Sequence, residues 1–143
     1  MKARIESFAH IICVDGSYNY EMAFNYLNQL SKTITLLNVD EFPEKQNCYI
    51  QIGLLYYRFH DYQNVIHYMK IGLTATPTNK ADRFVVELNN DIGAAYQRLN
   101  LLDSADTYFK RGLKAITYEK ETDSLWYGIL QGNLSKNLYA KQI

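Results

Sequence analysis

Three histidines and two cysteines are the side chains of this sequence best suited to binding a metal ion. A helical metal site commonly uses two histidines four residues apart, so that both imidazoles share one face. His60 and His67 are seven residues apart and His10 lies far upstream, so no pair has this spacing. Cys13 and Cys48 have no neighbouring ligand at metal spacing, and we expect both to be buried as small apolar side chains. We therefore expect no metal site.

Sequence motifs of nucleophilic and nucleotide-dependent enzymes are also missing. The serines are not flanked by the glycines of a nucleophile elbow, and the sequence contains no glycine-rich phosphate-binding loop. The pair Asp15-Gly16 is typical of a helix end followed by a turn. We therefore expect a protein that is not an enzyme, with no catalytic residues and no cofactor.

Charge and hydropathy narrow the range of partners. Fifteen basic residues balance fifteen acidic residues, so no net field attracts nucleic acid or an anionic membrane. The apolar stretches are far shorter than the roughly 20 residues of a membrane span, so no membrane insertion is expected. The first residues carry an acid early and lack the apolar segment of a secretory signal, which favours a cytoplasmic location. An extracytoplasmic sensor is the alternative if a signal was removed.

The elements that position any site are predicted to be helices. Apolar and aromatic residues recur at intervals of three and four, as on one helix face, at positions 49, 52, 56 and 59 and again at 62, 65, 66, 69 and 73. A short polar break separates the two stripes, and Pro77 follows the second. Together they predict a helical hairpin over residues 45–75.

The same pattern recurs along the chain, which is typical of a repeat protein. Residues 52–56 (IGLLY) match residues 92–96 (IGAAY), forty positions later. Their glycines, Gly53 and Gly93, are expected to let the paired helices approach closely. We predict one all-α domain over residues 1–143 with about seven helices. Its expected parts are hairpins at 4–37, 45–75 and 80–118, the first beginning with a helix at about 4–14 and the third at about Lys80, and a terminal helix at 122–141.

These residues resemble the tetratricopeptide repeat family. Residues 46–79 match its 34-residue pattern without a gap, with Tyr49 at the large aromatic position, Ile52-Gly53 at the Leu-Gly pair and Tyr56 at the tyrosine. The next repeat keeps most of the pattern but has Asn89 at the aromatic position. Its longer spacing is similar to repeats of bacterial sensor and regulator proteins. The resemblance implies a right-handed α-solenoid of antiparallel helix hairpins, with three repeats and a terminal helix.

The resemblance also implies where a partner would bind, because in this family the first helix of each hairpin lines a concave groove. Aligning the repeats gives the candidate peptide- or partner-binding residues Asn47, Gln51, Leu54, Tyr57, Arg58, Glu87, Asn90, Asp91, Gln97, Arg98, Gln131, Asn133 and Lys136. Amide side chains can bond an extended backbone, arginines can bind a carboxylate, and Tyr57 can provide a flat contact. The carboxylate clamp of chaperone-binding members is not expected, because Ile50 and Asn90 stand where its lysine would be sought.

Two functions fit these observations. The first is an interaction module that binds a protein or peptide, as the sensing part of a larger bacterial signalling or regulatory protein. The second is an oligomerisation or autoinhibitory element whose groove is filled by a second copy or by the protein's own segments. A homo-oligomer is therefore one possible assembly.

Overall fold

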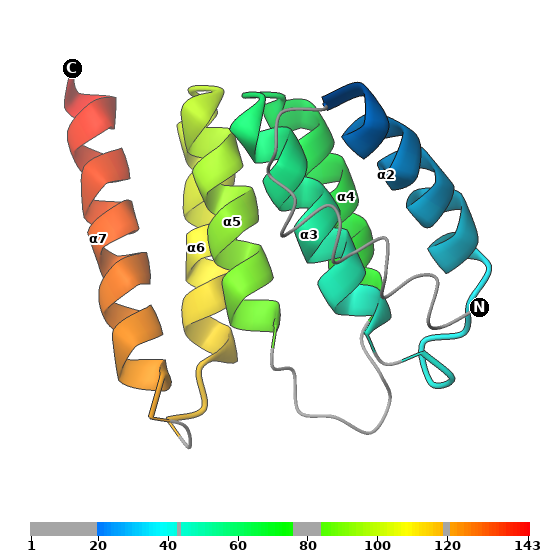
Figure 1. Ribbon diagram of the computed structural model, residues 1–143. Coiled ribbons are helices and arrows are strands. Elements are labelled where there is room, and N and C mark those ends of the chain that lie inside the picture. Colours follow the sequence, from blue (N-terminus) through cyan, green and yellow to red (C-terminus); the bar gives the residue numbers. More distant parts are fainter. Residues whose placement is uncertain (1–19, 43, 76–83, 119–120) are drawn as a thin grey trace.

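The computed structural model describes residues 20–42, 44–75, 84–118 and 121–143, which form six α-helices and no strand (Figure 1). The helices are α2 (Tyr20–Thr35), α3 (Lys45–Arg58), α4 (Tyr62–Thr74), α5 (Val85–Arg98), α6 (Leu102–Ala115) and α7 (Asp123–Gln142). The predicted all-α class is confirmed. The described fold has six helices and not the predicted seven, since the helix expected at about 4–14 lies outside the described residues.

The predicted hairpins correspond to pairs of consecutive helices. Helices α3 and α4 form the hairpin expected at 45–75, α5 and α6 fall within 80–118, and α7 follows as the terminal helix. Helix α5 begins at Val85, and the extension expected back to about Lys80 lies outside the described residues. The helices stand side by side, with α7 at one end, α2 at the other, and α3 and α5 in front of α4 and α6 (Figure 1).

The turns inside the two complete hairpins are copies of one another. His60 after α3 and Asn100 after α5 both have φ of 58°, in the left-handed region. After α3, the N–H of Asp61 donates a hydrogen bond of 3.1 Å to the carbonyl of Tyr56, and the corresponding bond after α5 is 2.9 Å long. These bonds satisfy carbonyls of the last helical turn and reverse the chain. The sequence repeat at an interval of forty is thus also a structural repeat.

One glycine in each hairpin sets the distance between its two helices. A Cβ atom built on Gly53 would lie 2.7 Å from Cγ of Met69, and one built on Gly93 would lie 2.5 Å from Cε1 of Phe109. Both distances are shorter than Cβ contacts in proteins, so a side chain at position 53 or 93 would force Met69 or Phe109 to shift, whereas glycine lets the paired helices approach without such a shift. The predicted role of the two glycines is confirmed.

Helix α7 packs in the same way as the first helix of a hairpin. A Cβ built on Gly72 of α4 would lie 3.4 Å from Cδ2 of Leu88 in α5, and one built on Gly112 of α6 would lie 3.1 Å from Cδ1 of Leu130 in α7. Helix α7 therefore covers α6 as α5 covers α4. Leu88 and Leu130, which are 42 positions apart, therefore occupy corresponding places in the two packings.

Candidate functional site

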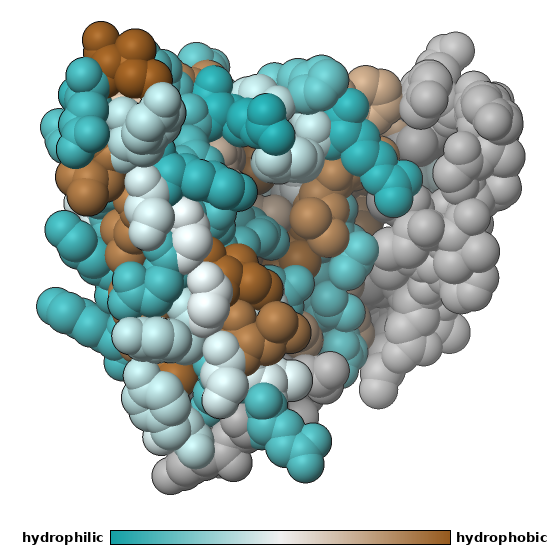
Figure 2. Space-filling view, turned by 90° about the vertical axis from the view of Figure 1, so that its left-hand side faces the viewer, coloured by the Kyte–Doolittle hydropathy of each residue, from teal (hydrophilic) through white to brown (hydrophobic). Residues whose placement is uncertain are grey.

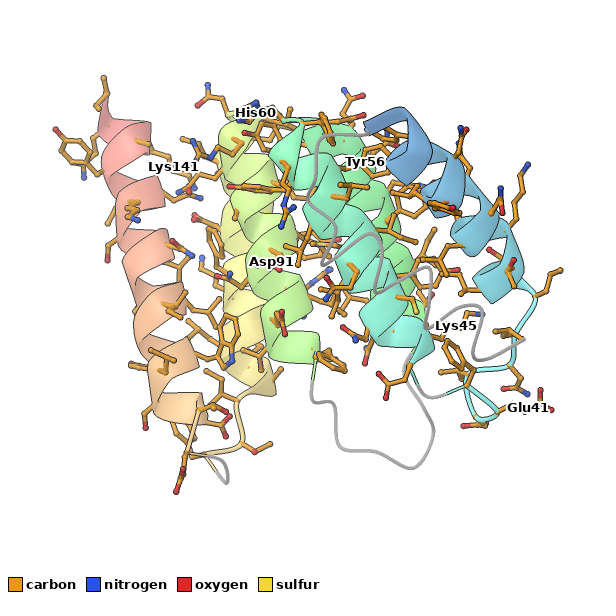
Figure 3. All side chains as sticks on the ribbon, in the orientation of Figure 1. Glu41, Lys45, Tyr56, His60, Asp91 and Lys141 are labelled. Carbon is orange, nitrogen blue, oxygen red and sulfur yellow. The ribbon has the colours of Figure 1, made fainter. Side chains whose placement is uncertain are left out.

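The candidate residues lie on α3, α5 and α7, the helices that pack as first helices. We call the side of these helices that carries them the first-helix face. Figure 3 labels Asp91 near the middle of α5, between α3 and α7. Three sets of side-chain contacts describe this face. Each set includes a hydrogen bond between helices of different repeats.

The first contact joins α3 to α5. Nε of Arg98 donates a hydrogen bond of 3.4 Å to the hydroxyl of Tyr57, which lies 41 positions earlier in the sequence. The edge of the Tyr57 ring also meets Tyr62 of α4, with ring centroids 5.3 Å apart. This contact holds the Tyr57 ring against the hairpin, and the long bond on an exposed guanidinium leaves Arg98 able to turn toward a carboxylate.

The second contact joins α5 to α7 through two asparagines. Nδ2 of Asn133 donates to Oδ1 of Asn90 at 2.9 Å, and Nδ2 of Asn90 donates to Oδ1 of Asp91 at 3.0 Å. The amide of Asn90 is thereby fixed in one orientation, and it directs one carboxylate oxygen of Asp91. Three candidate residues from two repeats are thus brought together.

Asp91 is the electrostatically unusual group of this face. The pKa of Asp91 is raised from 3.8 to about 6, chiefly by burial of its carboxyl. The bond from Asn90 acts in the opposite direction, and the negative charge of Glu87 one turn earlier adds to the rise. The carboxylate therefore carries its charge at neutral pH at a cost in free energy. A cationic group placed beside it would relieve that cost.

The third contact involves a residue that the sequence analysis missed. Gln97 of α5 donates through Nε2 to Oδ1 of Asn137 in α7 at 2.7 Å. Nδ2 of Asn137 donates in turn to the carbonyl of Leu102 and to Oδ1 of Asp106, both at 2.9 Å. Lys141 then bridges Asp106 at 2.6 Å, near the end of the molecule where it is labelled in Figure 3. This network fixes α7 against α5 and α6.

A sequence signal for Asn137 existed. Positions 126, 130, 134 and 137 form the three-and-four stripe that faces the core, so Asn137 falls where an apolar residue would be expected. A buried amide at such a position must be hydrogen-bonded, which identifies it as a packing determinant.

The remaining candidates are more loosely placed. Nε2 of Gln51 donates to Oδ1 of Asn47 at 3.3 Å, one turn apart on α3. Leu54, Arg58 and Lys136 are exposed. Gln131 is also exposed, but it lies two positions from Asn133 and so leaves α7 on a different side. The structure thus does not bring Gln131 together with the other candidates.

The histidine, cysteine and acidic side chains of the described residues form no metal-binding cluster. No group of three or more histidine, cysteine or acidic side chains there could hold a metal ion. His67 meets the ring of Tyr68 edge-on, and His60 lies beside Tyr62. Cys48 is buried in the core, as predicted, and Cys13 lies outside the described residues. No helix in the described part is both long and apolar enough to cross a membrane.

Comparisons with known proteins add no relative. No model of a protein family matches the chain, and neither the curated proteins nor the solved structures contain a match. The resemblance to tetratricopeptide repeats therefore rests on the residues that this chain repeats within itself.

Proposed function

We propose that the chain is a protein- or peptide-binding module of the tetratricopeptide type, which holds an extended segment across the first-helix face. The observation that carries this proposal is the pair of bonds Arg98 to Tyr57 and Asn133 to Asn90, which join candidate residues of three successive first helices. Residues distant in sequence thereby form one polar surface across α3, α5 and α7. In this proposal the hairpins belong to a right-handed α-solenoid, and the module senses a partner for a larger bacterial regulatory protein.

The charges of this face favour a ligand of mixed character. At the centre, Glu87 and Asp91 lie one turn apart on α5 and suit a basic side chain or an amino terminus. Arg58, Arg98 and Lys136 are exposed on α3, α5 and α7 and suit acidic groups. The amides of Asn47 and Gln51 suit the backbone of an extended segment. The expected partner is therefore a segment with a basic residue flanked by acidic ones.

The position of Asp91 supports binding over a purely structural role. A half-buried carboxylate beside a second acid is unfavourable for folding, since neither burial nor a like charge stabilises it. Residues that lower stability while remaining reachable from solvent are common at functional sites. A structural spacer would gain stability from asparagine at this position, because the amide bears no charge.

A display selection tests this proposal. Peptides selected from a random library on the wild-type domain are expected to bind with micromolar affinity, which corresponds to about −8 kcal/mol. Arg58→Ala and Arg98→Ala should each weaken such a peptide by about 1–3 kcal/mol without lowering the melting temperature. The matched control is Lys110→Ala on α6, because Lys110 is exposed on a second helix. Lys70 is unsuitable as a control, since its Nζ donates to the hydroxyl of Tyr96 at 2.7 Å.

Two results would count against the proposal. The first is a selection that yields no peptide. The second is a set of peptides whose affinity falls equally with Arg98→Ala and Lys110→Ala, because that would place recognition elsewhere. The alternative function, a structural element without an external ligand, would then be favoured.

A further inference from the structure

The carboxyl group of Asp91 is oriented by a relay of two amides. Nδ2 of Asn90 donates to its Oδ1 at 3.0 Å, and this is the one hydrogen bond that the described residues give this carboxyl group. Asn90 is oriented in turn by Asn133 of α7, whose Nδ2 donates to Oδ1 of Asn90 at 2.9 Å. Helix α7 forms the end of the molecule that faces the viewer in Figure 2, where hydrophilic and apolar residues are mixed. A residue of the terminal helix therefore acts on Asp91 through Asn90.

The charged groups around Asp91 do not neutralise its carboxylate. Glu87, one turn earlier on α5, is the charged group of the described part that acts on it, and the two charges have the same sign. Helix α5 packs against α4, α6 and α7, and Arg98 joins it to α3. The charged side chains of these helices are bonded elsewhere or exposed, among them Arg58, Lys70, Asp106, Lys136 and Lys141. The carboxylate therefore has no counter-ion within the described part of the chain.

This environment favours the protonated form of Asp91. Burial and a like charge both disfavour an ionised carboxylate, and one neutral amide donor only partly offsets them. The pKa of Asp91 is accordingly about 6. The carboxylate is then ionised in about nine molecules in ten at pH 7, and in about one in ten at pH 5. Mild acid thus removes the charge that would hold a cationic ligand.

We propose that the first-helix face holds its cationic ligand only while Asp91 is ionised and releases it on mild acidification. In this proposal Asn133 is a positioning residue, which acts through Asn90 to set the pH of release. The inference rests on the proposed function, because it concerns the ligand of that same face.

The size of the effect follows from the fraction of ionised molecules. When a ligand binds one form of a site, its apparent dissociation constant is the intrinsic constant divided by the fraction in that form. A fall from pH 7 to pH 5 should therefore weaken binding by about tenfold. By reciprocity, a bound cationic group lowers the pKa of Asp91. Acid should thus stabilise the free fold and weaken binding, two effects of opposite sign.

Titration calorimetry at pH 7, 6 and 5 tests this release. The probe is a peptide selected on the wild-type domain at pH 7 that carries lysine, no histidine and an acetylated amino terminus, so its basic groups do not titrate in this range. Its dissociation constant for the wild-type domain should rise about tenfold from pH 7 to pH 5.

Asp91→Asn is the matched control, because an amide does not titrate. It should bind the peptide more weakly than the wild type at pH 7, and with the same affinity at pH 7 and pH 5. The exposed histidines His60 and His67 are kept in this variant, so their titration contributes equally to both proteins. A rise in the dissociation constant of Asp91→Asn equal to that of the wild type would overturn the role of Asp91.

Two further variants test the relay. Asn133→Ala frees Asn90, and loss of the bond that lowers the pKa of Asp91 should move release to higher pH. Glu87→Gln removes the like charge and should move release to lower pH. Circular dichroism melting verifies that both variants fold. An unchanged pH of release in Asn133→Ala would overturn its positioning role, since a purely structural contact would alter stability without moving this pH.

The failure of this inference differs from the failure of the proposed function. A peptide that binds the wild-type domain equally well at pH 7 and pH 5 would overturn the pH-dependent release and leave the binding function intact. A selection that yields no peptide at either pH would overturn both.

Discussion

Gln97 of α5 donates a hydrogen bond of 2.7 Å to Asn137 of α7, although the two residues are forty positions apart. Asn137 is completely buried, and its amide also bonds the carbonyl of Leu102 and the carboxylate of Asp106. One side chain therefore joins three helices beside the first-helix face. Candidate residue Gln97 owes its orientation to a residue outside the candidate set.

Substitution of Asn137 by leucine should lower the free energy of unfolding by about 2–3 kcal/mol, because the amide of Gln97 and the carboxylate of Asp106 lose their buried partner. Urea denaturation followed by circular dichroism measures this loss. Gln142→Ala, an exposed change on the same helix, should have little effect. A wild-type midpoint for Asn137→Leu would contradict the assigned network.

The two close-contact glycines should differ in their tolerance of alanine. At Gly93 the added methyl group would meet the rigid ring of Phe109, whereas at Gly53 it would meet the flexible side chain of Met69. We expect Gly93→Ala to lower stability by about 1–3 kcal/mol through overpacking. Gly53→Ala should cost less, since Met69 can change rotamer and alanine favours the helix by about 1 kcal/mol. Thermal melting of both variants measures the difference, and the reverse order would contradict the assigned contacts.

Asn89 offers a stabilising substitution. It is 4% exposed and takes the position of Tyr49 in the preceding repeat, but its Oδ1 accepts no hydrogen bond from the protein, while its Nδ2 donates to the carbonyl of Val85. A buried acceptor without a donor costs about 1–3 kcal/mol. Asn89→Leu should therefore raise the free energy of unfolding by about 1 kcal/mol or more, as measured by urea denaturation. A loss of stability would indicate that a bound water satisfies Oδ1.

Because the pKa of Asp91 is raised, the free energy of unfolding should fall as the pH rises from about 4 to about 6. The pKa of Asp91 is about 6 in the folded chain against an ordinary value of 3.8, so in this range the folded state binds more protons than the unfolded state. Stability then falls with rising pH and becomes constant above the folded pKa, at a total cost of about 2–3 kcal/mol. Urea denaturation at several pH values, compared between wild type and Asp91→Asn, isolates this contribution. Equal pH dependence of the two proteins would contradict the raised pKa.

The sequence was sufficient to predict the helices and their repeat, for reasons that are local. The stripes of α3 and α4 and the glycines at 53 and 93 are read directly from spacing, because a helix face is defined by intervals of three and four. Spacing of this kind also predicts the terminal helix at 122–141, which corresponds to α7. Which side chains hydrogen-bond one another inside the site is not determined locally in this sense. Helical spacing cannot tell that Arg98 bonds Tyr57, since this depends on how neighbouring hairpins pack.

Two features of the site needed the three-dimensional arrangement. Asn137 stands in the core stripe of its helix, and only the meeting of α5, α6 and α7 shows that its amide has three partners. The raised pKa of Asp91 depends on burial by surrounding helices, which the pair Glu87 and Asp91 alone does not indicate. Gln131 was predicted to share a binding face with Asn133. Two residues along a helix change the side-chain direction by about 200°, so the two side chains leave α7 on different sides.

The most direct test of the binding proposal is a paired measurement on Asp91→Asn, of its melting temperature and of its affinity for a peptide selected on the wild-type domain. Removing the costly charge should raise the melting temperature at pH 7, while loss of the carboxylate that receives a basic residue should weaken the peptide by about tenfold, or 1.4 kcal/mol. A stability gain combined with an affinity loss is the predicted result. Unchanged affinity for every selected peptide would contradict the proposal that this face binds a ligand.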